Sequence, residues 1–307
     1  MSTDSPDIQK VGVVGCGLMG SGIAEVCARG GPHTLVYEVD KAALDRGRER
    51  IEQSLERAVA RGRLAPEEAE RVSGSLAFTT DLEDFADRDL TIEAVPESED
   101  LKAGIFEALD RIVQRPDALF ASNTSSIPVM KLGAVTSRPG QVMGLHFFNP
   151  VPVLDLVELV PSLATDDRAW ARMRHFVSGV LGKHVIVSQD RAGFVVNSLL
   201  VPYLLSAIRM FESGFAVAQD IDEGMVRGCG HPMGPLALVD HIGLDTTLAV
   251  AESLYAEFRE PLYAPPPLLS RMVQAGNTGR KSGRGFYPYP KPASPPRIDT
   301  TPRSPSC

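Results

Sequence analysis

The chain has 307 residues, of which 43% are hydrophobic, so it is long enough for one large domain or two ordinary ones with a packed core. Its formal net charge of −8 argues against a general binder of nucleic acid or anionic membranes, because such binders depend on a net basic field. The four cysteines, Cys16, Cys27, Cys229 and Cys307, show no CxxC spacing, which is typical of free thiols in a reducing compartment. Because the polar N-terminus lacks the apolar core of a signal peptide, we expect a cytoplasmic protein.

Two further stretches limit the class of protein. The most apolar window, FVVNSLLVPYLLSAIRMF (194–211), contains an asparagine, a proline and an arginine. It is too interrupted to span a bilayer, which needs about 20 apolar residues, so we interpret it as a buried helix and expect no membrane contact. The last stretch, 290–307, is rich in proline and serine, which predicts a disordered tail.

In chain order, the first predicted element is a strand at 10–15, KVGVVG, a short β-branched run that ends in glycine. A helix-like stretch follows at 18–31 and a second strand at 34–40, which together form a βαβ unit. Helices are predicted at 41–63, 66–74 and 101–113, and further strands at 90–95, 118–123, 142–147 and 154–160. This alternation is typical of a doubly wound α/β domain.

The pattern changes near Asp190, where the predicted strands stop. Helical periods then run from Phe194 to the GFY at 285–287, with Gly214 expected as a C-cap and Asp220 in the first turn of the next helix. We therefore predict an α/β domain over 1–190, an all-helical domain over 191–289 and the tail over 290–307.

Three glycines, Gly15, Gly17 and Gly20, form G-x-G-x-x-G between the first strand and the first helix. They allow a tight turn, close approach of a pyrophosphate to the backbone, and close packing of helix on strand. With Leu18 and Met19 they predict the phosphate-binding turn of a Rossmann-type dinucleotide-binding domain.

Glu38 lies near the end of the second predicted strand and decides which dinucleotide is favoured. A carboxylate there accepts hydrogen bonds from a ribose 2′-OH but repels a 2′-phosphate. For charges about 4 Å apart the repulsion is roughly 1 kcal/mol in water and about 4 kcal/mol at an effective dielectric of about 20. We therefore expect NAD rather than NADP, although Lys41 and Arg46 lie nearby in the sequence and would soften the preference.

A hydride transfer to NAD also needs a group that takes the hydroxyl proton. Histidine is the usual group, since its unperturbed pKa of about 6.5 is near the working pH. Five of the six histidines stand where a structural or solvated role is more ordinary, namely His33, His175, His184, His231 and His241. His146 differs, because GLHFFNPV (144–151) surrounds it with apolar residues that exclude water.

An imidazole that becomes charged benefits from a carboxylate partner. Glu158 lies 12 residues on, in LDLVELV, a run too apolar to hold an unpaired carboxylate cheaply. Asp155 is the competing candidate. Spacing alone leaves the pairing of His146 with Glu158 open.

Six ordered motifs carry a family resemblance over residues 10–289. They are VGVVGCGLMGSGIA, ASNTSSIP, GLHFFNPVPVLDLVELV, GFVVNSLLVPYLLSAI, HPMGPLALVDHIGLDT and GRKSGRGFYPY. Together they resemble the short form of the 3-hydroxyacyl-CoA dehydrogenase family. The resemblance implies NAD-dependent interconversion of an L-3-hydroxyacyl thioester and the 3-ketoacyl thioester.

The resemblance also implies roles for individual residues. The catalytic set would be His146, Glu158, Ser125 and Asn197, with the last two also binding substrate. Further contacts would come from Glu93, Lys102 and Asn123 to the cofactor, and from Ser54 and Arg61 to CoA. Without the resemblance, Glu93 would be taken as capping a strand end and Lys102 as a solvated lysine. Asn197 falls in the predicted helical domain, so we expect the site to form between the two domains.

Other readings remain open. The helix at 41–63 carries six arginines, which suit a solvated face, the phosphates of CoA or the acidic surface of an acyl carrier protein. A dehydrogenase of a free 3-hydroxy acid, of the sugar-acid or carnitine type, and a catalytically silent dinucleotide-binding protein are further alternatives. We predict no metal site. The apolar stretch 239–254 favours a homodimer.

Overall fold

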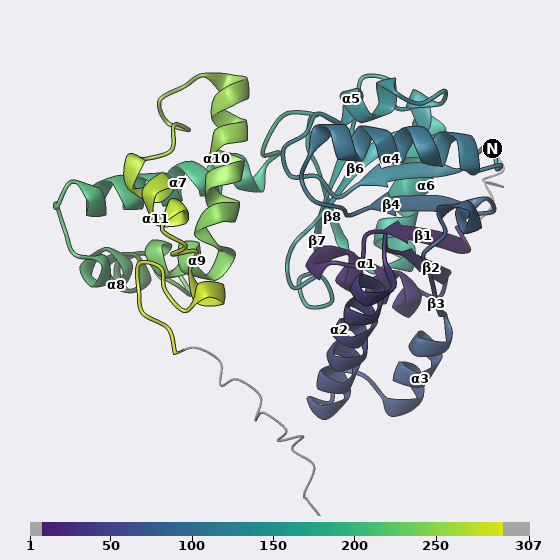
Figure 1. The fold of residues 1–307 in the computed structure, drawn as a ribbon, viewed down its shortest axis with the longest axis horizontal. Coiled ribbons are helices and arrows are strands. Elements are labelled where there is room, and N and C mark those ends of the chain that lie inside the picture. The colour runs from purple at the N-terminus through teal and green to yellow at the C-terminus, as the bar shows by residue number, and fades with distance from the viewer. Residues whose placement is uncertain (1–7, 291–307) are drawn as a thin grey trace, which may run out of the picture. The chain divides into compact units, whose positions relative to one another are not determined.

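The computed structural model describes residues 8–290, and its contacts divide the chain into two units, Met1–Ser198 and Leu199–Cys307 (Figure 1). The sequence placed a boundary near Asp190. The division by contacts lies eight residues further on, after Ser198. The segment after Asp190 is hydrogen-bonded to the first unit, since Gly193 N donates to the Ser125 carbonyl at 3.1 Å. The predicted tail lies, except for Pro290, outside the described residues.

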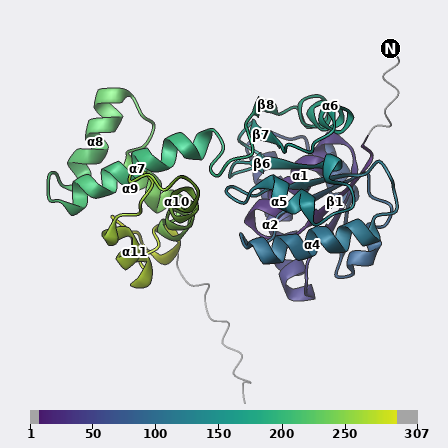
Figure 2. The same ribbon diagram turned by 90° about the horizontal axis from the view of Figure 1, so that it is seen from above.

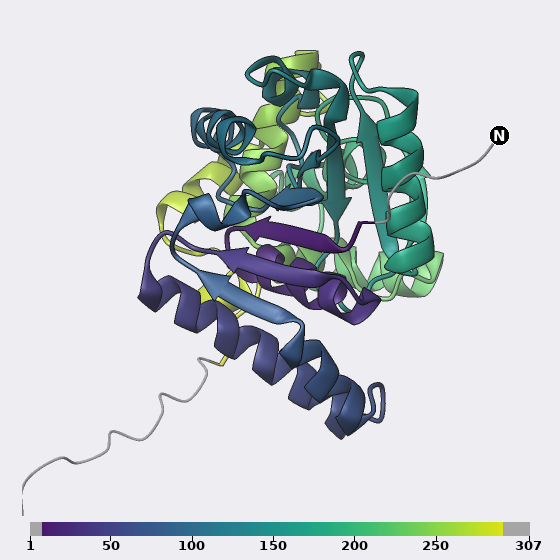
Figure 3. The ribbon, with the colours of Figure 1, turned by 90° about the vertical axis from the view of Figure 1, so that its right-hand side faces the viewer.

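The first unit contains one eight-stranded sheet with the order β3-β2-β1-β4-β5-β6-β7-β8. The strands are β1 Lys10–Val14, β2 His33–Tyr37, β3 Leu76–Thr79, β4 Leu90–Glu93, β5 Leu119–Ser122, β6 Val142–Phe147, β7 Leu156–Pro161 and β8 His184–Val187. All neighbours pair in parallel except β6 and β7, which are antiparallel. The central strands β1 and β4 are buried almost throughout because both faces of the sheet are covered. Figure 3 shows the N-terminal strands, purple to blue, side by side.

Helices cover both faces of this sheet. On one face the buried side chains of the sheet pack with those of α1 Leu18–Gly30, α2 Lys41–Ala60, α3 Pro66–Gly74 and α6 Asp167–His175. On the other they pack with α4 Glu99–Ile112 and α5 Val129–Ala134 (Figure 2). The predicted doubly wound α/β domain is confirmed. The sequence missed β3, a four-residue half-buried strand without a β-branched run.

Four strands end at the same edge of the sheet because they run parallel. Val14, Glu93, Ser122 and Phe147 are the last residues of β1, β4, β5 and β6. The strand order reverses at β1, which has β2 on one side and β4 on the other. In open α/β sheets a ligand binds in the crevice outside the carboxyl ends at such a reversal.

The second unit is helical, as predicted. After α7 Val196–Glu212, which begins in the first unit, come α8 Ala218–Cys229, α9 Pro235–Ile242, α10 Leu244–Phe258 and α11 Pro267–Gln274. Asp240 holds the C-terminal GFYPY motif, because its carboxylate accepts hydrogen bonds from Phe286 N, Tyr287 N and the Tyr289 hydroxyl. None of the helices within residues 8–290 has the length and hydropathy needed to cross a bilayer.

Candidate active site

The glycine-rich turn connects β1 to α1 and fits a pyrophosphate. Gly15 has φ +95°, a left-handed conformation that favours glycine, and a Cβ on Gly20 would lie 1.8 Å from the Gly15 carbonyl oxygen. Gly17 caps α1 without any side-chain hydrogen bond, and a Cβ there would meet no atom within 4 Å. No side chain therefore caps the first amides of α1, and a ligand can approach the backbone at Gly17, as phosphates do at helix N-termini.

Glu38 follows β2 and lies beside this turn. Its Oε2 accepts a hydrogen bond from Cys16 N at 2.8 Å, and its Oε1 accepts one from Val39 N at 3.1 Å. Leu18 is 62% exposed, whereas Met19 packs against the core. The carboxylate and the turn thus form one edge of a dinucleotide site.

From the sequence we expect Lys41 to soften the preference for NAD, but Lys41 forms an ion pair with Asp45. Its Nζ lies 2.7 Å from Asp45 Oδ2, so the lysine is held by an acidic residue of its own helix rather than by Glu38. The negative charge of Glu38 is therefore not offset by Lys41, and this favours NAD over NADP.

His146 and Glu158 face one another across the antiparallel strands β6 and β7, where they are register partners. The distance from His146 Nδ1 to Glu158 Oε2 is 2.6 Å, and the two side chains are 8% and 0% exposed. This hydrogen bond fixes the ring orientation and leaves Nε2 as the nitrogen without a hydrogen bond in the described part of the chain. Asp155, the competing candidate, is exposed in the turn before β7.

The second oxygen of Glu158 is also engaged. Oε1 accepts hydrogen bonds from Val195 N at 3.0 Å and Val196 N at 2.9 Å. These amides follow Phe194, whose φ of +47° is rare for a non-glycine residue and costs about 1–2 kcal/mol. Both oxygens of the buried carboxylate are therefore satisfied, which offsets the cost of burying its charge.

Aromatic rings surround the imidazole. The ring centroids of Phe148 and Phe194 lie 4.6 Å and 5.5 Å from that of His146. The FFNP motif and the GF motif thus supply apolar cover from segments far apart in the sequence. This cover keeps water from the buried side of the pair and strengthens its electrostatic interaction.

Asn123 and Ser125 follow β5 at the same edge of the sheet. Asn123 Oδ1 accepts a hydrogen bond from Phe147 N at 2.9 Å, which ties this loop to the residue after His146. The hydroxyl of Ser125 and the carboxamide of Asn197 form no hydrogen bond among the described residues. Both are half-buried, and both remain available for a ligand.

Glu93 and Lys102 are buried against each other, with a distance of 2.7 Å between Lys102 Nζ and Glu93 Oε1. Their side chains are 0% and 1% exposed, and Glu93 also accepts hydrogen bonds from Ser122 Oγ and Val95 N. Glu93 and Lys102, which the resemblance selected as cofactor contacts, thus form an internal ion pair at the carboxyl end of β4. A carboxylate that the sequence analysis did not select, Glu97, lies 3.2 Å from Lys102 Nζ.

Glu97 organises the loop that carries Ser125. Its Oε1 accepts hydrogen bonds from the backbone amides of Ser125 and Ser126 and from the hydroxyls of Thr124 and Ser126. Burial opposes its charge, but Lys102 and these hydrogen bonds outweigh burial and lower its pKa. The sequence held one signal for Glu97. It lies in the short loop between β4 and α4, directly before Ser98, the N-cap of α4.

Ser54 and Arg61 lie along one side of α2, because residues seven apart are separated by two helical turns, roughly 10 Å. Ser54 is half-buried and Arg61 is exposed at the C-cap. Among residues 8–290, the Arg61 side chain forms no ion pair. An anionic group is therefore free to approach this side of the helix.

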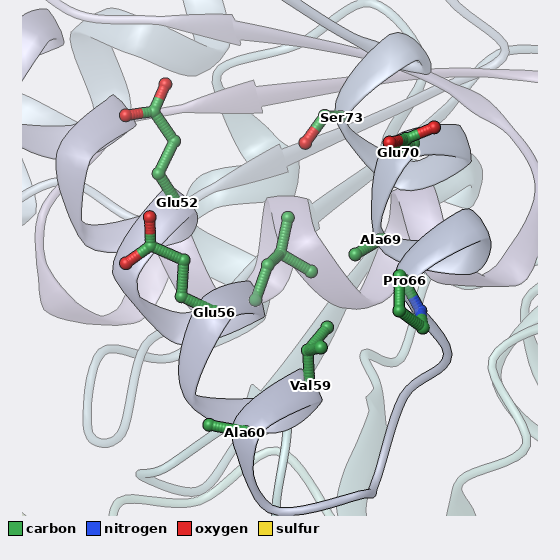
Figure 4. A pocket seen from close by; sticks show the side chains of 9 residues that line it. Glu52, Glu56, Val59, Ala60, Pro66, Ala69, Glu70 and Ser73 are labelled. Atoms are coloured by element: carbon green, nitrogen blue, oxygen red, sulfur yellow. The ribbon is translucent and has the colours of Figure 1, made fainter.

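A pocket of about 610 Å³ lies between α2 and α3 (Figure 4). Three carboxylates, those of Glu52, Glu56 and Glu70, surround an apolar lining that includes Val59 and Ala69. Because carboxylates repel phosphates, this pocket does not suit the phosphates of a dinucleotide or of CoA.

The reversal of strand order, the open glycine-rich turn beside Glu38, and the buried imidazole–carboxylate pair at the same sheet edge define an NAD-dependent oxidoreductase. Comparison with known proteins identifies the family. The family model for the 3-hydroxyacyl-CoA dehydrogenase NAD-binding domain matches residues 10–191, and the model for its C-terminal domain matches residues 193–289. The chain belongs to the 3-hydroxyacyl-CoA dehydrogenase family.

Individual relatives agree with this assignment. A 3-hydroxybutyryl-CoA dehydrogenase of Mycobacterium tuberculosis is 60% identical over 93% of this chain and 100% of its own length. The crystal structure of M. tuberculosis FadB2 superposes with a TM-score of 0.92 at 59% identity, covering 93% of this chain and 100% of that one. The (S)-3-hydroxybutyryl-CoA dehydrogenase of Ralstonia eutropha has a TM-score of 0.87 at 44% identity, with the same shares covered.

Proposed function

We propose that the protein interconverts L-3-hydroxybutyryl-CoA and acetoacetyl-CoA with NAD. The 2.6 Å contact between His146 and Glu158 carries this proposal, because it provides an oriented proton acceptor at the carboxyl edge of a dinucleotide-binding sheet. The short acyl chain is supported by the relative that is 60% identical, a 3-hydroxybutyryl-CoA dehydrogenase.

His146 Nε2 takes the proton from the C3 hydroxyl during oxidation and returns it during reduction. Glu158 holds the ring in one orientation and stabilises the imidazolium that forms. The Ser125 hydroxyl and the Asn197 carboxamide hydrogen-bond the oxygen at C3 and so orient the reacting carbon. When bound, NAD supplies the nicotinamide that exchanges a hydride with this carbon.

Residues at the sheet edge bind the cofactor in this proposal. Gly15, Gly17 and Gly20 admit the pyrophosphate, with Leu18 and Met19 in the first turn of α1, and Glu38 accepts hydrogen bonds from the adenosine ribose. Asn123 contacts the nicotinamide end of the cofactor. The side chains of Glu93 and Lys102 are buried, so they support the cofactor site indirectly. Lys102 pairs with both Glu93 and Glu97 and so holds Glu97 in place.

The CoA portion binds along α2 through Ser54 and Arg61. Arg61 is exposed and unpaired within the described residues, so its charge is available to a phosphate. The same exposed charge would also suit an acidic carrier protein that bears the thioester. The assay must therefore include both forms of substrate.

An absorbance assay of NADH consumption tests the proposal. The substrates are acetoacetyl-CoA, longer 3-ketoacyl-CoAs, an acetoacetyl carrier protein and free acetoacetate, each at matched concentrations. We expect the highest kcat/KM with acetoacetyl-CoA, and a tenfold or greater rise in KM for it in Arg61→Met without a matching change for free acetoacetate. A carrier-linked or free acid that reacts faster than every CoA ester contradicts the proposed substrate.

We also propose a cytoplasmic homodimer formed by the second unit. In the stretch 239–254, Leu244, Ala251 and Leu254 are buried, whereas Ile242 is 36% exposed. Larger exposed apolar side chains lie between α7 and α8, where Phe215 is 78% exposed and Val217 is 61% exposed. Light scattering tests the mass of the assembly, and Phe215→Ser combined with a second polar substitution at Val217 should shift it toward the monomer.

A further inference from the structure

Helix α2 packs directly against the glycine-rich turn. Cys16, between Gly15 and Gly17, is 1% exposed, and its side chain points at Gly47 of α2. A Cβ on Gly47 would lie 2.1 Å from Cys16 Sγ, so only glycine allows this approach. The position of the turn therefore depends on α2 as well as on β1 and α1.

Arg50, one turn further along α2, reaches the backbone of the same residue. Its NH1 donates a hydrogen bond to the Cys16 carbonyl oxygen at 2.9 Å. The Cys16 amide donates to Glu38 Oε2 at 2.8 Å. Two oppositely charged side chains thus hold the two backbone groups of one residue, and hydrogen bonds to charged groups are roughly twice as strong as neutral ones.

The carbonyl of Cys16 and the amide of Gly17 belong to one peptide unit. In a planar trans peptide these two groups point in opposite directions, so a bond that fixes the carbonyl also fixes the amide. At Gly17 the space next to the Cα is open, and no side chain caps the helix. The hydrogen bond from Arg50 to the Cys16 carbonyl therefore fixes the direction of the Gly17 amide at the start of α1.

We propose that Arg50 is a positioning residue for NAD. Its guanidinium orients the peptide between Cys16 and Gly17 so that the Gly17 amide can donate to the pyrophosphate. In the sequence analysis Arg50 is one of the six arginines of the helix at 41–63, for which a solvated face, CoA phosphates and an acyl carrier protein all stayed open. The hydrogen bond to Cys16 assigns it to the cofactor instead.

Titration of the purified enzyme with NADH, followed by fluorescence in the absence of any acyl substrate, tests this role. We expect Arg50→Met to weaken NADH binding about tenfold, in line with loss of a charge-assisted hydrogen bond. KM for NAD should rise by a similar factor, while kcat at saturating NAD changes less than about twofold. Arg50→Lys, which keeps the charge and one donor, should recover at least part of the affinity.

Arg71→Met is the matched control. Arg71 is also an exposed arginine, and its NH2 donates to a backbone carbonyl, that of Arg29, at 3.2 Å. Its loss should leave NADH binding unchanged. Thermal unfolding of each variant without cofactor reports on stability, and if Arg50→Met does not fold, Arg50→Gln and Arg50→Lys replace it in the titration.

Three outcomes overturn the proposal: wild-type NADH affinity in Arg50→Met or Arg50→Gln, an equal loss in Arg71→Met, or an effect confined to KM for the acyl substrate. Because NADH binding is measured without substrate, the result does not depend on which thioester the enzyme prefers. Failure of this inference is therefore distinguishable from failure of the proposed substrate.

Discussion

The backbone amide of Ser125 donates a hydrogen bond to Oε1 of Glu97 at 3.0 Å. The other carboxylate oxygen of Glu97 lies 3.2 Å from Lys102 Nζ, and Lys102 is held in turn by Glu93. A row of three charges, of which Glu93 and Lys102 are buried, therefore links β4 and α4 to the loop after β5. Through this row Glu97 determines where the Ser125 hydroxyl lies.

Glu97→Gln should lower kcat with acetoacetyl-CoA by about tenfold, because the neutral amide no longer pairs with Lys102 and the Ser125 loop loses its anchor. The effect on NADH affinity should be smaller than the effect on kcat. Steady-state kinetics and NADH titration measure the two quantities. A variant with wild-type kcat and KM would contradict the positioning role.

The lowered pKa of Glu97 predicts a change in stability at acid pH. A carboxyl group whose pKa is depressed on folding stabilises the protein above its unfolded value, here near 4.5, and this contribution is lost as the pH falls through the folded pKa. The free energy of unfolding should therefore fall less steeply below about pH 4.5 in Glu97→Gln than in the wild type. Urea unfolding at a series of pH values measures the two slopes, and equal slopes would argue against the ion pair.

His146→Gln should reduce kcat by at least about 100-fold, as expected for loss of a general base, with little change in NADH affinity. Glu158→Gln should reduce kcat and also lower the melting temperature, since its amide group cannot accept all the hydrogen bonds of the buried carboxylate. Near-normal turnover in His146→Gln would remove the mechanism proposed here.

Glu38→Ala should weaken NADH binding by about tenfold, because the ribose loses its acceptor and Cys16 N loses its partner. Affinity for NADPH should fall less, so the preference between the two cofactors narrows. Glu38→Gln separates the effects, since it keeps an acceptor without the charge. Unchanged NADH binding in Glu38→Ala would refute the ribose assignment.

The buried cysteines should resist alkylation in the native protein. Burial raises the pKa of the Cys16 thiol to about 12 and that of Cys27 to about 12, so at pH 8 both are protonated and inaccessible. Cys229 is exposed. Peptide mapping after iodoacetamide treatment should find label at Cys229 well before Cys16 or Cys27, and early loss of NAD binding through Cys16 modification would disagree with this packing.

Much of the fold could be predicted from local sequence patterns. The glycine spacing and Glu38 predicted the βαβ unit because each element of it is encoded within about 30 consecutive residues. The partner of His146 was less certain, since a 12-residue spacing does not fix strand register. The antiparallel pairing of β6 with β7 selects Glu158 over Asp155.

Other contacts had no local signal. Glu97 binds amides 28 and 29 residues away, and Arg50 binds a carbonyl 34 residues away. Such bonds depend on how strands and helices are arranged in space, which periodicity does not report. Glu93 and Lys102 were selected by resemblance, and only the structure reveals that their side chains are buried against each other.

The pairing of His146 with Glu158 also constrains how the turn between β6 and β7 can change. Successive side chains on a strand alternate between the faces of a sheet, so sliding β7 by one residue would turn Glu158 away from the ring and bring Val157 or Leu159 opposite it. Insertions in this hairpin are therefore tolerable only when the added residues bulge outward and the alignment of the two strands is kept.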